Sequence, residues 1–163
     1  MATLQQILTH PDRRSQVVAD LMTLMAEEVK QQQGLFGILV RKCFDLFKKL
    51  EGGYFIERAI TMMLPEGAKA LDPYYQSYCK LGDHRPSFGD YLGRSGREVT
   101  EAILAITDRR RDQSNNPVLV MTYNGLRSQV VPILEREIPA LGAVLARHAL
   151  AEATRADASE KDL

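Results

Sequence analysis

Apolar residues recur at intervals of three and four positions along almost the whole chain. This spacing places them on one face of a helix with about 3.6 residues per turn, whereas a half-buried strand alternates at every second residue. The pattern is strongest from 35 to 50, where Phe36, Leu39, Val40, Cys43, Phe44, Leu46, Phe47 and Leu50 cover roughly half of the helical circumference. It predicts an all-α protein in which this helix is central to the core and Phe44 and Phe47 are buried.

Capping residues, glycines and prolines divide the chain into separate predicted helices. Ser, Thr and Asp favour helix N-termini, while glycine and the residue before proline favour helix ends. We therefore expect one helix to end at Pro65, another to begin at Asp72–Pro73, and a long one to follow Ser87. Before the clearest break, at 114–117, the predicted helices cover residues 4–8, 12–30, 35–50, 54–64, 73–81 and 88–111.

The segment 118–131 has two interpretations. Asn124–Gly125 is a strong hairpin signal, and the residues before it are apolar and partly β-branched. A helical stripe also fits the segment, and 126–131 does not alternate as a strand should, so we favour a helix, kinked at Pro132. Pro139 is expected to open a last helix, and 156–163 to be a disordered tail.

These elements predict a single helical domain over residues 1–155. We expect a compact, irregular bundle of about six or seven helices rather than a coiled coil. The chain has 163 residues, of which 45% are hydrophobic, so it is long enough to bury a continuous core.

Composition narrows the classes of function. Lys plus Arg and Asp plus Glu both total 21, so the formal net charge is zero and nothing indicates the basic face that nucleic-acid binders use. The two cysteines, Cys43 and Cys79, belong to no close-spaced ligand motif and indicate reduced thiols. The sequence shows neither a secretory leader nor an apolar run that could span a bilayer, which predicts a cytoplasmic protein.

Several short phrases, taken in their order along the chain, resemble one family. They are Val17-Val18-Ala19-Asp20, Leu64-Pro65, Ala70-Leu71-Asp72-Pro73-Tyr74, Thr107-Asp108-Arg109, Asn116-Pro117, Leu126-Arg127 and Pro139-Ala140-Leu141-Gly142. The chain is similar to an uncharacterised, all-helical bacterial protein family catalogued as a domain of unknown function, from about Leu4 to His148. Gly93 and Gly96 depart from its pattern. The resemblance implies a bacterial cytoplasmic protein and no particular activity.

Candidate binding residues come from charge, aromatic and glycine clusters. Asp108, Arg109 and Arg110 belong to the densest charge cluster, which either complements a helix C-terminus or binds an anion or acidic partner. Tyr74 and Tyr78 share a helical face and suit a pocket wall or an interface, although core packing explains them as well. Gly93, between Gly89 and Gly96, marks either close helix packing or room for a ligand.

No catalytic motif is present, and we predict no metal and no cofactor. The three histidines, His10, His84 and His148, form no paired ligand motif. The first hypothesis is therefore a non-enzymatic helical interaction module that binds an unknown protein partner or itself. The alternatives are a protein that binds a hydrophobic ligand or a membrane surface, and an enzyme whose first candidates are Asp108, Arg109 and His148.

Overall fold

The structure is a computed structural model that describes the backbone of residues 1–161 and the side chains of residues 1–34 and 37–151. Over residues 1–161 the backbone forms helices and no strand, which confirms the all-α fold class. The helices are α1 (Leu4–Leu8), α2 (Pro11–Gln31), α3 (Gly34–Lys49), α4 (Phe55–Cys79), α5 (Phe88–Gly93), α6 (Gly96–Asp112) and α7 (Pro117–Lys161), with one 3-10 turn, η1 (Leu50–Gly53).

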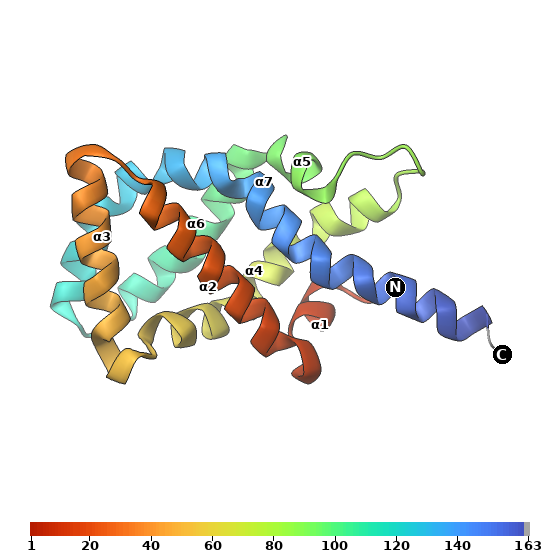
Figure 1. Cartoon of the computed structure of the whole chain (residues 1–163), viewed down its shortest axis with the longest axis horizontal. Coiled ribbons are helices and arrows are strands. Elements are labelled where there is room, and N and C mark those ends of the chain that lie inside the picture. Colours follow the sequence, from red (N-terminus) through yellow and green to blue (C-terminus); the bar gives the residue numbers. More distant parts are fainter. Residues whose placement is uncertain (162–163) are drawn as a thin grey trace.

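The long helix α7 runs along most of the molecule, and α1, α2, α5 and α6 pack against it (Figure 1). Helices α5 and α6 pack against α7, while α1 and α2 pack against both α4 and α7. Helix α3 stands across one end of the molecule and contacts α2, η1 and α4. The bundle is therefore irregular, as the sequence predicts.

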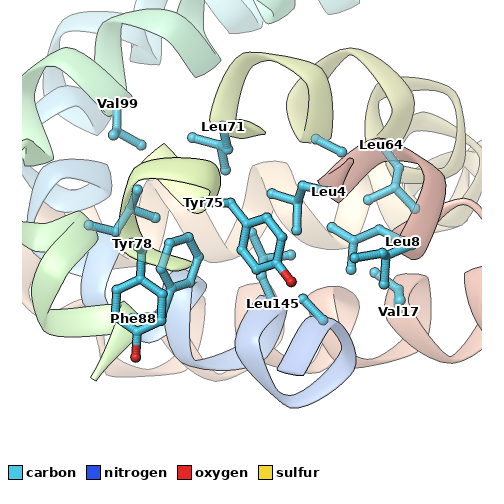
Figure 2. Packing of buried hydrophobic residues seen from close by; sticks show 14 of the residues in the cluster. Leu4, Leu8, Val17, Leu64, Leu71, Tyr75, Tyr78, Phe88, Val99 and Leu145 are labelled. Carbon is cyan, nitrogen blue, oxygen red and sulfur yellow. The ribbon is translucent and has the colours of Figure 1, made fainter. Parts of the chain in front are cut away.

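The core lies where α1, α2, α4, α5, α6 and α7 meet. Figure 2 shows its buried side chains, with Leu4 and Leu8 of α1 beside Leu64 and Val17. Aromatic rings extend the core toward α5, where the ring of Phe88 lies 5.9 Å from that of Tyr75 and 5.1 Å from that of Tyr78. These buried residues supply most of the apolar surface that stabilises the fold.

Helix α4 is continuous from Phe55 to Cys79, so the predicted end at Pro65 and the predicted start at Asp72–Pro73 are wrong. Each interior proline removes a backbone hydrogen bond and disfavours the helix by about 3 kcal/mol. The buried face of α4 outweighs that cost, because it packs against α1, α2 and α6. The Asp72 carboxylate caps α1 instead, accepting the N–H of Leu4 at 2.6 Å.

The predicted helix 88–111 is divided in the structure. It breaks after Gly93, and α6 begins at Gly96. Ser87 caps α5 as expected, since its Oγ accepts the N–H of Asp90 at 3.1 Å. Both glycines permit a break because they have the lowest helix propensity after proline.

The segment 118–131 is helical, which confirms the favoured interpretation over the hairpin. Asn116 starts the helix, because its Oδ1 accepts the N–H groups of Val118 and Leu119 at 3.1 and 3.2 Å. Pro139 lies inside α7, so the prediction that it opens a separate helix is wrong. The disordered tail at 156–163 stays a prediction; α7 is helical to Lys161, and residues 162–163 lie outside the described part.

Helix α3 is peripheral, so the prediction that it is central to the core is wrong. The side chains of Phe44 and Phe47 are half-buried, and those of Ile38, Leu39 and Leu46 are 46%, 46% and 45% exposed. Phe36 lies outside the described side chains. A wide apolar arc shows that a helix has much apolar surface, but it does not show which part of that surface the other helices cover.

Candidate functional site

An apolar cavity of about 450 Å³, partly open to solvent, lies between the helices. It lies between α2, α4, α6 and α7, and α1 and α3 each contribute one side chain to its wall. Its apolar lining consists of Leu8, Leu21, Leu24, Met25, Val29, Val40, Ala59, Ile60, Met63, Leu64, Gly67, Ala68, Leu71, Ile103, Ile106, Val130, Ile133, Leu134, Leu141 and Leu145. Four further lining residues are polar: Glu28, Gln32, Thr107 and Glu137.

The two ends of this apolar cavity differ in character. At the inner end its wall is the core itself, with Leu8, Leu64, Leu71 and Leu145 almost completely buried. The side chains of Glu28 and Glu137 are 15% and 25% exposed and belong to the part of the wall nearer to solvent. The cavity is therefore apolar at depth, while its partly solvated edge carries Glu28 and Glu137 together with Met25, which is 40% exposed.

Two carboxyl groups meet at that edge, and we call Glu28 and Glu137 the carboxyl pair. The Arg136 Nη2 donates to Glu28 Oε1 at 3.3 Å and the Gln32 amide donates to the same oxygen. Burial, and after it the hydrogen bond and charge of Glu28, raise the pKa of Glu137 above its ordinary value. Each of these effects favours the protonated form of Glu137.

The predicted site residue Asp108 lies elsewhere, in a network that ties α6 to α7. Arg127 donates two hydrogen bonds of 2.8 Å to its two carboxylate oxygens, and the Tyr123 hydroxyl donates a third of 2.6 Å. The guanidinium of Arg127 is the main reason why the pKa of Asp108 falls to about 2. This geometry joins α6 to α7, and the carboxylate of Asp108 already accepts three hydrogen bonds.

Arg109 and Arg110 both bind the carboxylate of Glu66 on α4, at 3.1 and 2.7 Å. Arg110 also donates to the carbonyl oxygen of Met62 at 3.3 Å. The single charge of Glu66 offsets one of the two positive charges that an anion would need. The cluster at the end of α6 thus links α6 to α4 in this structure.

The tyrosines and Gly93 are placed apart from the charge cluster. The Tyr74 hydroxyl donates to Glu98 at 3.2 Å, and the buried Tyr78 donates to the carbonyl oxygen of Pro86 at 2.9 Å. A Cβ added to Gly93 would lie 2.8 Å from the Pro139 ring, which matches the close-packing interpretation of the glycines. The structure does not bring the predicted site residues together, and none of them lines the apolar cavity.

Sequence reasoning missed the carboxyl pair, although a signal exists. Glu28 lies four and seven residues after Leu24 and Leu21, and Glu137 lies four residues before Leu141, so each carboxyl falls on an apolar helical stripe. A carboxyl on a core-facing stripe is rare unless it is paired. Two such carboxyl groups on different helices predict that their side chains pair with each other.

His148 pairs with Asp20, and the distance from its Nε2 to Asp20 Oδ2 is 2.8 Å.

In the part of the chain that the structure describes, no three His, Cys, Asp or Glu side chains gather as metal ligands would. Within the same part, no helix combines the length and the apolar character needed to cross a membrane.

Comparison with known proteins places the chain in a family without assigning an activity. No curated protein and no solved structure matches it. The sequence pattern described as Family of unknown function (DUF6918) matches residues 4–149, nearly the range over which the resemblance was expected. The chain therefore belongs to this family of unknown function.

Proposed function

We propose that this protein binds an apolar small molecule, such as one hydrocarbon or acyl chain, in the apolar cavity. The observation that carries the proposal is the cavity itself, about 450 Å³ in volume with an almost wholly apolar wall. Small-molecule sites in proteins typically measure about 300–1,000 Å³ and combine apolar walls with a few polar groups. The cavity has both properties.

The volume sets the size of the ligand. It is about three times the ~150 Å³ that accommodates one benzene in an engineered apolar cavity, so it suits a chain on the order of fifteen carbon atoms. One long acyl chain partitions into a membrane with an association constant of about 10⁴ M⁻¹, because each buried methylene contributes about 0.8 kcal/mol. An association constant of about 10⁴ M⁻¹ corresponds to a dissociation constant of about 100 μM, so we expect the cavity to bind its ligand with dissociation constants of roughly tens to hundreds of micromolar.

Small residues on α4 maintain the space. Ala59, Gly67 and Ala68 all line the cavity, where larger side chains would fill it. A Cβ added to Gly67 would meet no atom within 4 Å, so close packing does not require this glycine. A glycine inside a helix costs up to about 1 kcal/mol relative to alanine. Space for a ligand explains why the helix has glycine at this position despite that cost.

The substitution Gly67→Leu tests the proposal, because it fills the cavity while improving helix propensity. The matched control is Gly125→Leu, since Gly125 is also an interior helical glycine, exposed, with no atom within 4 Å of its added Cβ. Fluorescence titration with the neutral apolar probe N-phenyl-1-naphthylamine measures binding. We expect saturable binding to the wild type and to Gly125→Leu, and at least about tenfold weaker binding to Gly67→Leu.

Two outcomes would overturn the proposal. One is a wild-type protein that gives no saturable increase in fluorescence. The other is a folded Gly67→Leu variant that binds the probe as the wild type does. Near-ultraviolet circular dichroism establishes that the variant keeps its tertiary structure.

A protein-interaction function is the second candidate, favoured by the outer face of α3. Leu39 and Leu46 are each nearly half exposed on that face, with the exposed Lys42 and Lys49 beside them. Exposed apolar groups of this kind mark interfaces when they are contiguous. Sedimentation velocity tests self-association: the variant Leu39→Lys/Leu46→Lys should remain monomeric at concentrations where the wild type associates, and a wild type that is monomeric throughout contradicts self-association.

We place this binding in the cytoplasm of a bacterial cell. The free thiols of Cys43 and Cys79 support a reducing compartment. The bacterial origin rests on the resemblance described above.

A further inference from the structure

The edge of the apolar cavity carries charge of one sign. Among the described residues of its wall, the charged ones are Glu28 of α2 and Glu137 of α7. Gln32 lies one helical turn after Glu28 and hydrogen-bonds to it. The faces of α4 and α6 toward the cavity are apolar except for the hydroxyl of Thr107. An occupant therefore meets a hydrocarbon wall except at the Thr107 hydroxyl and beside Gln32 and the carboxyl pair.

Two arginines lie near the carboxyl pair, and neither is part of the cavity wall. Arg136 of α7 approaches Glu28 and Glu137 at 3.3 and 4.0 Å, with 64% of its side chain exposed to solvent. Arg41 of α3 donates to the backbone carbonyl of Gln32. Solvent screens an exposed guanidinium, so it offsets the charge of the half-buried carboxyl groups only in part.

We propose that the ligand of the apolar cavity is an amphiphile with a protonated amine at its head, bound between Glu28 and Glu137. This inference rests on the proposed function of the cavity. An ammonium group has three N–H donors and can serve carboxylate oxygens from two sides. Its positive charge also offsets the negative charge of the two carboxyl groups.

Other head groups fit this edge less well. A hydroxyl offers one donor and no charge, so it gains a hydrogen bond but does not relieve the repulsion between two carboxylates. A carboxylate head adds a third negative charge to the pair and is repelled. The order of affinity at equal chain length should therefore be amine, then alcohol, then carboxylate.

Displacement of N-phenyl-1-naphthylamine by dodecylamine, dodecanol and dodecanoate measures this order. Near neutral pH we expect dodecylamine to displace the probe at a concentration about tenfold lower than dodecanol does, since hydrogen bonds between charged groups are the stronger ones. The substitution Glu137→Gln should abolish the advantage of the amine and leave dodecanol unchanged. The control Glu27→Gln, at an exposed carboxyl next to Glu28 but outside the cavity wall, should keep the advantage.

The dependence on pH provides an independent readout. Burial, and after it the hydrogen bond and charge of Glu28, raise the pKa of Glu137, so a rise in pH ionises a larger fraction of this carboxyl group and strengthens its attraction for an ammonium. The advantage of dodecylamine over dodecanol should therefore grow as the pH rises from about 5 to about 8, while the amine itself stays protonated. In Glu137→Gln this trend should be absent.

The outcomes separate this inference from the proposed function. If dodecanol and the probe bind and Gly67→Leu blocks both, but dodecylamine has no advantage, the amine head group is refuted and the apolar site remains. An advantage that persists in Glu137→Gln also refutes it, because the carboxyl pair would then play no part. If neither the probe nor dodecanol binds, the proposed function fails first.

Discussion

The contact between α5 and α7 depends on glycine, and Gly89→Ala should disrupt it. A Cβ on Gly89 would lie 2.4 Å from the carbonyl oxygen of Pro139 and 3.3 Å from the backbone nitrogen of Ala143. From the other side, a Cβ on Gly142 would lie 2.8 Å from the Cα of Gly89. Backbone atoms cannot rotate away as the end of a side chain can, so the two helices would have to separate.

The magnitude follows from two opposing effects. Overpacking a close contact costs about 1–3 kcal/mol and occasionally more, and the backbone clash at Gly89 belongs to the upper part of that range. Higher helix propensity returns up to about 1 kcal/mol. We expect a net loss of about 2 kcal/mol in the free energy of unfolding. For a chain of this size this lowers the Tm by roughly 4–8 °C.

Urea unfolding followed by far-ultraviolet circular dichroism measures the loss. The control is Gly125→Ala, where the new Cβ meets no atom within 4 Å and helix propensity alone acts. That variant should gain about 0.5–1 kcal/mol. If Gly89→Ala is as stable as Gly125→Ala, the close approach of α5 to α7 is refuted, and with it the packing interpretation of the glycines.

Three further predictions concern charge and packing. Asp108→Asn should lower the free energy of unfolding at pH 7 by about 1–2 kcal/mol. Because the folded pKa of Asp108 is depressed to about 2, the wild type should lose the same contribution as the pH falls from about 4 to about 2. Urea midpoints of the wild type at about pH 4 and about pH 2 measure this loss, and equal midpoints would contradict it. Glu137→Gln should raise the free energy of unfolding at neutral pH by less than about 1 kcal/mol. The reason is that a raised folded pKa makes the stability of the wild type decline as the pH rises above the ordinary glutamate value. The gain should vanish at about pH 4, and an equal gain at neutral pH and at about pH 4 would argue against the carboxyl pair. Phe47→Ala should cost about 1–2 kcal/mol rather than the 3–5 kcal/mol usual for a core phenylalanine, since Phe47 is half-buried. A loss as large as that of the buried Phe88→Ala in the same urea assay would place α3 in the core.

Local signals were sufficient for the helical class and for several helix ends. Thr3, Ser87 and Asn116 all cap helices through their side chains, and the spacing of apolar residues is helical over 118–131 as well. These features depend on residues close in sequence, so sequence patterns reveal them. They account for the class and for much of the division into elements.

Features that depend on tertiary packing could not be predicted in this way. Pro65 breaks a helix in isolation, but α4 continues through it because its neighbours bury one face of the helix. The apolar arc of α3 does not reveal that α3 lies at the edge. The apolar cavity exists because side chains from several helices leave a space between them, and no single segment encodes that space. The sequence therefore indicated clusters at Asp108 and Tyr78, whereas the cavity lies elsewhere.

Methyl NMR with a spin-labelled ligand tests the central proposal most directly. A dodecyl chain that carries a nitroxide broadens the signals of methyl groups near it. We predict the strongest broadening for methyls of the cavity wall, such as those of Leu64, Val130 and Ile133, and clearly weaker broadening for Leu39 and Leu46 on the outer face of α3. Broadening confined to Leu39 and Leu46, with Leu64 and Ile133 unaffected, would contradict the account.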